Sequence, residues 1–140
     1  MADRIPTVAG VHGGILVIVG AVYTAIGITW HVADSPTREA GIDWLPWHAV
    51  NATAVAWTWV LAGMFTLACG LFSKGHRRWE NAAYFVGIFV PLLLATWFLI
   101  AWIVGTAPTG ILTTIAYTGY ALILGWVGAR VRDDVQEASP

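Results

Sequence analysis

The sequence predicts an all-α integral membrane protein with four transmembrane helices. Charged residues make up only 11% of the chain and hydrophobic residues 58%, whereas a typical soluble domain carries about 25% charged residues. No Asp, Glu, Lys or Arg occurs in residues 5–33, 44–73 or 81–129. A membrane-spanning helix needs roughly 20 apolar residues, so the first two stretches each hold one helix and the third holds two.

The four helices form one domain that covers residues 1–140. TAPTG at 106–110 interrupts the longest uncharged stretch with residues typical of a turn. The apolar run of the first helix is longer than that of a signal peptide, so we expect the helix to remain as a permanent span. The expected helices are about 8–30, 49–72, 81–104 and 111–129.

A long connection, residues 31–48, joins the first two helices. Ser35 before Pro36 is typical of a helix start, with Ser as the cap and Pro at the first position, and Gly41 is a plausible stop. The apolar residues that follow Gly41 are unusual for a free loop. We therefore expect a short helical turn and then a segment on the membrane surface.

Basic residues predict the orientation, because cytoplasmic loops collect Lys and Arg. If both termini are cytoplasmic, six of the seven basic residues lie on that side and only Arg38 lies on the other. The chain is then a multi-pass protein of the cytoplasmic (inner) membrane, with an outer loop at 31–48, a cytoplasmic loop at 73–80 and a cytoplasmic tail at 130–140. The residues expected to determine this topology are Lys74, Arg77, Arg78, Arg130 and Arg132.

Six of the nine tryptophans fall at the expected membrane boundaries. The amphipathic indole ring favours the level of the lipid headgroups. The predicted interface anchors are Trp30, Trp44, Trp47, Trp79, Trp102 and Trp126.

Small residues repeat along three of the helices and indicate where helices pack, because they let backbones approach closely in lipid. A heptad of small residues suits a left-handed crossing near +20°, and we favour a tight contact between the first two spans over the simple abundance of Gly in membrane helices. Whether this seam joins helices of one chain or of two is left open. The residues are Gly13, Gly20 and Gly27, Ala56, Gly63 and Gly70, and Ala121 and Gly125.

Pro91 lies midway along the third expected helix. Proline has no backbone N–H to donate, so it frees a carbonyl one turn earlier and favours a kink. Thr96 is a candidate to bond a carbonyl freed in this way.

The sequence contains no phosphate loop, zinc signature or nucleophile elbow, and we expect no catalytic residue, no cofactor and no enzymatic activity. His31 and His48 bracket the outer loop and are candidate metal ligands, with Asp34 and Asp43 as possible additional ones, but the spacing matches no standard motif. We interpret the two histidines as polar residues that cap helix ends. The net charge of −1 predicts no binding to nucleic acid.

The order of features resembles the small four-span membrane proteins of actinobacteria and their phages. The resemblance rests on WLPW at the end of the outer loop, AWTWVLAG and ACGLF in the second span, and the basic turn GHRRWE before the third. In phage genomes such proteins often lie near lysis genes and are suspected of being holins. The resemblance covers nearly the whole chain in the order of its features, and it implies no catalytic residue.

Three functions are compatible with these observations. The first is a phage holin-like protein that self-associates and permeabilises the membrane. The second is a non-enzymatic accessory or interaction subunit of a membrane complex. The third is a small-solute transporter, with Trp57, Trp59 and Trp97 around an apolar pocket, although no span carries a carboxylate that could couple transport to protons.

Overall fold

The computed structural model describes residues 10–33, 35–42, 51–73 and 76–137, apart from the side chains of Gly10, Val11, Thr37 and 130–137. The described residues form helices and turns and contain no strand, which confirms the all-α prediction. The helices are α1 (Gly10–Val32), α2 (Pro36–Ile42), α3 (Ala52–Phe72), α4 (Arg77–Val104) and α5 (Gly110–Glu137).

Four of these helices are long and apolar enough to cross a membrane. Their candidate spans contain 21, 21, 28 and 20 residues in α1, α3, α4 and α5 respectively. At 1.5 Å rise per residue, 20 residues span about 30 Å, the thickness of the hydrocarbon core. The chain therefore has the build of a multi-pass membrane protein.

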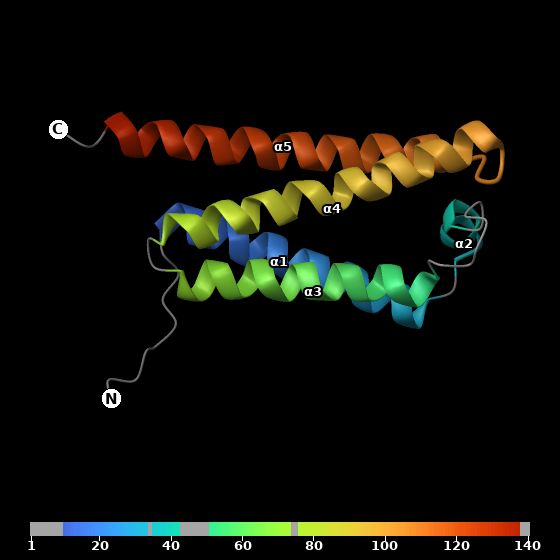
Figure 1. The fold of residues 1–140 in the computed structure, drawn as a ribbon, viewed down its shortest axis with the longest axis horizontal. Coiled ribbons are helices and arrows are strands. Elements are labelled where there is room, and N and C mark those ends of the chain that lie inside the picture. The colour runs from blue at the N-terminus through green and yellow to red at the C-terminus, as the bar shows by residue number, and fades with distance from the viewer. Residues whose placement is uncertain (1–9, 34, 43–50, 74–75, 138–140) are drawn as a thin grey trace.

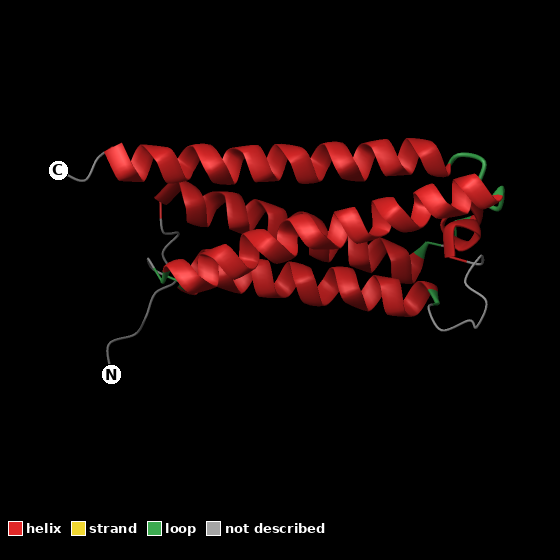
Figure 2. Ribbon diagram, turned by 45° about the horizontal axis from the view of Figure 1, so that its top comes forward, coloured by secondary structure: helices red, strands yellow, loops and turns green. Residues whose placement is uncertain are grey.

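The long helices form two antiparallel pairs (Figure 1). The most extensive contact joins α1 to α3, the next joins α4 to α5, and the two pairs meet mainly where α3 packs against α4. In Figure 1, α4 lies between α5 and the α1–α3 pair, and Figure 2 shows that the described part of the chain is made of helices and loops. The start of α1, the α3–α4 connection and the end of α5 lie at one end of the bundle, and α2 lies at the other (Figure 1).

The short helix α2 begins as Ser35-Pro36 predicts. The carbonyl of Ser35 accepts hydrogen bonds from the backbone N–H groups of Arg38 (2.9 Å) and Glu39 (3.1 Å). The helix ends at Ile42, one residue beyond the predicted stop at Gly41. Both Gly41 and Ile42 are buried, so α2 packs onto the end of the bundle rather than standing free in solvent.

Two expected helix starts lie at different residues in the structure. α3 begins at Ala52 rather than 49, because the Asn51 side chain accepts a hydrogen bond from the Ala54 N–H at 2.8 Å and caps the helix there. α4 begins at Arg77 rather than 81, so half of the expected 73–80 loop is helical. The first turn of α4 contains Arg77, Arg78 and Glu80, which are good helix formers.

The last helix also continues past its expected end. We placed the end of this helix at 129 and a tail at 130–140, but α5 runs to Glu137. Charged residues mark where an apolar span stops, but a helix can continue beyond the span into water because its hydrogen bonds join backbone groups of the same helix. Residues 130–137, RVRDDVQE, contain no Gly or Pro that would end the helix earlier.

The turn between α4 and α5 depends on one glycine. Gly105 has φ 86°, in the left-handed region that favours glycine. Its N–H bonds the Trp102 carbonyl, and the Thr106 N–H bonds the Ala101 carbonyl at 3.0 Å. These bonds satisfy the last carbonyls of α4, and the helix ends at Val104 as predicted.

Candidate functional site

A seam of small residues holds α1 against α3. A Cβ added to Gly20 would lie 2.7 Å from the Gly63 carbonyl oxygen, and one added to Gly63 would lie 2.5 Å from the Thr24 nitrogen. Because the nearest atoms belong to backbone, they cannot move aside as a side chain would. The seam pairs residues in opposite directions along the two helices: Gly13 with Gly70, Gly20 with Gly63, and Gly27 with Ala56.

The seam is therefore occupied within one chain. Each step of seven residues along α1 matches a step of seven in the reverse direction along α3, which is the register that antiparallel helices require. These glycines are buried and cannot also face a second copy. The question that the sequence left open is decided here in favour of packing inside the chain.

The small residues of α5 lie at its contact with α4. Ala121 is buried. A Cβ on Gly125 would lie 3.7 Å from the Ile88 side chain, and one on Gly128 would lie 3.1 Å from the Tyr84 ring. At Gly125 and Gly128, the nearest atoms of α4 belong to side chains, whereas at Gly20 and Gly63 they belong to backbone. The α4 and α5 backbones are therefore packed less closely at these positions than the α1 and α3 backbones are at the seam.

Tyr23 bonds the carbonyl that Pro91 frees. In an uninterrupted helix, the N–H of residue 91 would donate to the carbonyl of Gly87, but proline has no N–H. The Tyr23 hydroxyl, from α1, donates to that carbonyl instead. Thr96, our candidate for this role, donates to the Leu92 carbonyl of its own helix at 2.9 Å.

Tyr23 belongs to an aromatic cluster between the two helix pairs, which we call the aromatic centre: Tyr23, Trp59, Phe98, Tyr117 and Tyr120. The Tyr23 ring meets the Trp59 indole edge to face, with centroids 4.7 Å apart. Trp59 and Tyr117 lie 5.7 Å apart, and Phe98 and Tyr117 lie 6.3 Å apart. The edge-to-face contact, which the ring quadrupoles favour, lies between α1 and α3. The two helix pairs are joined by tilted ring contacts, Trp59 with Tyr117 and Tyr23 with Tyr120 of α5.

Trp59 leaves one polar group unsatisfied. Its side chain is 1% exposed, and within the described part of the chain its Nε1 is the one buried side-chain nitrogen or oxygen without a hydrogen-bond partner. Such a donor costs free energy when it is buried. The packing of the ring against Tyr23 and Tyr117 is what holds it there.

Arg38 ties α2 to the end of α1. Its Nη1 donates to the Thr29 carbonyl at 3.1 Å, and its guanidinium lies 5.2 Å from the centre of the Trp30 ring. Trp30 is only 6% exposed. The structure thus places this predicted interface anchor inside the protein, beneath Arg38 and not among lipid headgroups.

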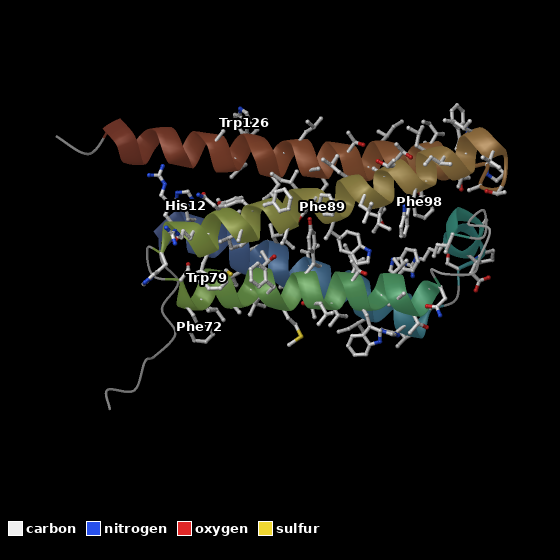
Figure 3. All side chains as sticks on the ribbon, viewed as in Figure 1. His12, Phe72, Trp79, Phe89, Phe98 and Trp126 are labelled. Atoms are coloured by element: carbon white, nitrogen blue, oxygen red, sulfur yellow. The ribbon has the colours of Figure 1, made fainter. Side chains whose placement is uncertain are left out.

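The other tryptophans predicted as anchors are placed differently. Trp79, Trp102 and Trp126 are 55%, 44% and 63% exposed, and Trp126 points away from the bundle (Figure 3). Trp44 and Trp47 lie outside the described residues. These exposed rings have surface that can meet lipid at the ends of the spans.

The basic end of the bundle contains Arg77 and Arg78, both exposed at the start of α4. Glu80 accepts a hydrogen bond from the Ser73 hydroxyl at 3.3 Å. Lys74 lies outside the described residues, and Arg130 and Arg132 lie in α5 with side chains that the structure does not describe.

His12 lies in the first turn of α1 at this same end. Its Nδ1 lies 3.3 Å from the Tyr84 hydroxyl, so the ring has a hydrogen-bond partner on α4. This contact ties the start of α1 to α4 at the basic end of the bundle.

His31, a candidate metal ligand, lies against the exposed ring of Trp57, with centroids 5.3 Å apart. His48 lies outside the described residues. Among the residues that were described, no three His, Cys, Asp or Glu side chains lie close enough to hold a metal ion.

Sequence reasoning did not assign roles to Tyr23 and Arg38. A signal for Tyr23 was present, because Pro91 identifies Gly87 as a carbonyl in need of a donor. The spacing along the chain does not say which hydroxyl reaches it. The contacts described above pack the helices against one another, and the polar side chains of Tyr23 and Arg38 donate hydrogen bonds to backbone carbonyls.

No protein-family model, curated protein or solved structure matches this chain.

Proposed function

We propose that this chain is a holin-type phage protein that self-associates in the cytoplasmic membrane and permeabilises it. The spans carry Asp, Glu, Lys, Arg or His only near their ends, which favours a role in the plane of the membrane over catalysis or ion-coupled transport. Both termini, the 73–80 segment and the end of α5 would lie in the cytoplasm, in accord with the distribution of basic residues.

The observation that carries the proposal is the outward face of α5. Only 17% of its candidate span is buried, against 33 to 44% for the other three. Its contacts are almost all with α4. A helix that packs on one neighbour leaves most of its surface to lipid or to another copy of the chain.

Small residues lie in the middle of that face. Nothing lies within 4 Å of a Cβ added to Gly119, and Ala116, one turn earlier, is exposed. Small residues allow close helix approach in lipid. The face is completed by large exposed apolar side chains: Leu112, Ile115, Leu122, Ile123 and Trp126.

The test is induced expression in a bacterium that also produces a cytoplasmic endolysin. We expect loss of membrane potential followed by lysis, read with a potential-sensitive dye and by culture turbidity. Gly119→Ile should reduce both lysis and cross-linked oligomers, because the larger side chain blocks close approach on α5. Ala68→Ile is the matched control, since Ala68 is an exposed small residue on α3. Normal growth at high expression would rule out the holin role.

An accessory subunit of a membrane complex is the second candidate. Phe85 and Phe89 are both exposed on α4 and stack with centroids 5.6 Å apart at 13°. An aromatic ridge of this kind suits contact with another membrane protein. Purification in mild detergent distinguishes the two: a stoichiometric partner favours the accessory role, and a homo-oligomer favours the first.

The structure offers little support for a transporter. Trp57 is 53% exposed beside His31, whereas Trp59 is buried in the aromatic centre. Two of the three tryptophans considered as lining one pocket therefore face in different directions.

A further inference from the structure

The first turn of α4 directs its positive charge outward. Arg77 and Arg78 are the first two residues of the helix and both are exposed. His76, the residue before them, is also exposed. The N-terminal end of a helix carries a partial positive charge of its own, which adds to that of the two guanidinium groups.

The carboxylate of the same turn faces the other way. Glu80 is the acidic residue in the first turn of α4 and is only partly exposed. It accepts a hydrogen bond from the hydroxyl of the buried Ser73 at the end of α3. It is engaged on the inner side of the helix, so the local counter-ion does not cover the two arginines.

An exposed indole lies beside these charges. The Trp79 ring meets the Phe65 ring of α3 with centroids 6.4 Å apart, yet it stays 55% exposed. Phe72, at the end of α3, is 61% exposed at the same end of the bundle (Figure 3). Tryptophan favours the headgroup level of a bilayer, so this ring places the arginines at the depth of lipid phosphates.

We propose that the first turn of α4 binds the phosphate of an acidic membrane phospholipid. Arg77 and Arg78 donate to the phosphate oxygens, which match the planar guanidinium group, and Trp79 lies against the glycerol and upper acyl region. One turn with two cations is too small for a nucleic-acid backbone, which needs a wider basic face. The proposal is independent of the function proposed above.

The test is native mass spectrometry of the full chain in mild detergent, titrated with phosphatidylglycerol or phosphatidylcholine. Each cation near an anionic surface contributes about 1 kcal/mol. Arg77→Gln with Arg78→Gln should therefore weaken phosphatidylglycerol binding about 25-fold and phosphatidylcholine binding much less, because the choline cation offsets the charge of its phosphate. Because both side chains are exposed, circular dichroism should show an unchanged helix content.

Glu80→Gln is the matched control in the same turn. It should leave lipid binding unchanged, because Glu80 faces inward. A several-fold gain would mean that Glu80 competes for the arginines and would contradict the proposal. Equal binding of the two lipids, an unaffected double variant, or displacement of the lipid by millimolar inorganic phosphate would each overturn it.

Discussion

Removing the Tyr23 hydroxyl tests how α4 accommodates its internal proline. In the wild-type chain that hydroxyl donates to the Gly87 carbonyl, which has no helical donor because residue 91 is proline. Tyr23→Phe keeps the ring in its contact with Trp59 and removes only the donor. The carbonyl is then left unsatisfied in an apolar interior.

The expected loss follows from the setting of this hydrogen bond. Hydrogen bonds between membrane helices contribute about 0.6 kcal/mol on average and up to about 1.7. Tyr23 is 0% exposed, and Pro91 removes the usual helical donor to this carbonyl, so we expect a value near the upper limit. Tyr23→Phe should lower the free energy of unfolding by about 1.5 kcal/mol.

A double-mutant cycle separates this bond from general packing. Pro91→Ala restores the N–H that bonds Gly87, so Tyr23→Phe should cost about 0.5 kcal/mol or less in that background. Tyr84→Phe is the control, because its hydroxyl meets His12 and not a carbonyl freed by proline. It should cost the same with or without Pro91.

Unfolding in mixed micelles of increasing SDS content, followed by tryptophan fluorescence, gives the four free energies. The reasoning is refuted if Tyr23→Phe costs the same in the wild-type and Pro91→Ala backgrounds, because the hydroxyl would then not be serving the carbonyl that proline frees.

Two further predictions follow from the seam and from the basic residues. Gly63→Val should destabilise the chain by about 2 kcal/mol in the same micelle assay, because its Cβ would meet α1 backbone at 2.5 Å, whereas Gly119→Val should change stability by less than about 0.5 kcal/mol; equal losses would contradict the assignment of the seam. Moving Lys74, Arg77 and Arg78 into the 34–43 segment should disturb or invert the topology of reporter fusions, because these cations favour the cytoplasm; unchanged reporter activities would show that other residues set the orientation.

Much of the helix layout could be read from the chain itself. Gaps between charged residues predicted four helices, and Ser35-Pro36 predicted the start of α2. The seven-residue repeat of small residues pointed to the contact between α1 and α3. These predictions succeed because each depends on local sequence: a span needs uncharged length, a cap needs a particular residue, and a close approach needs the absence of a side chain.

Helix ends were less predictable at the charged boundaries. The start of α4 at Arg77 and the continuation of α5 to Glu137 differ from the expected positions. Charge reports the transition from lipid to water, whereas the helix ends only where its hydrogen bonds are capped or interrupted.

The sequence by itself determined that the chain is helical and apolar enough to span a membrane four times, because hydropathy and spacing act along the chain. Only the tertiary structure decided which groups meet across it. Trp30 has the residue type and the position at a span end that are typical of an interface anchor, yet it lies buried beneath Arg38. Pro91 announces a carbonyl without a donor, but the donor comes from Tyr23, 64 positions away from that carbonyl in the chain. Contacts between residues so far apart in the chain depend on how the helices rotate and cross. The residue pattern of one helix does not indicate which side chain of a neighbouring helix will face it.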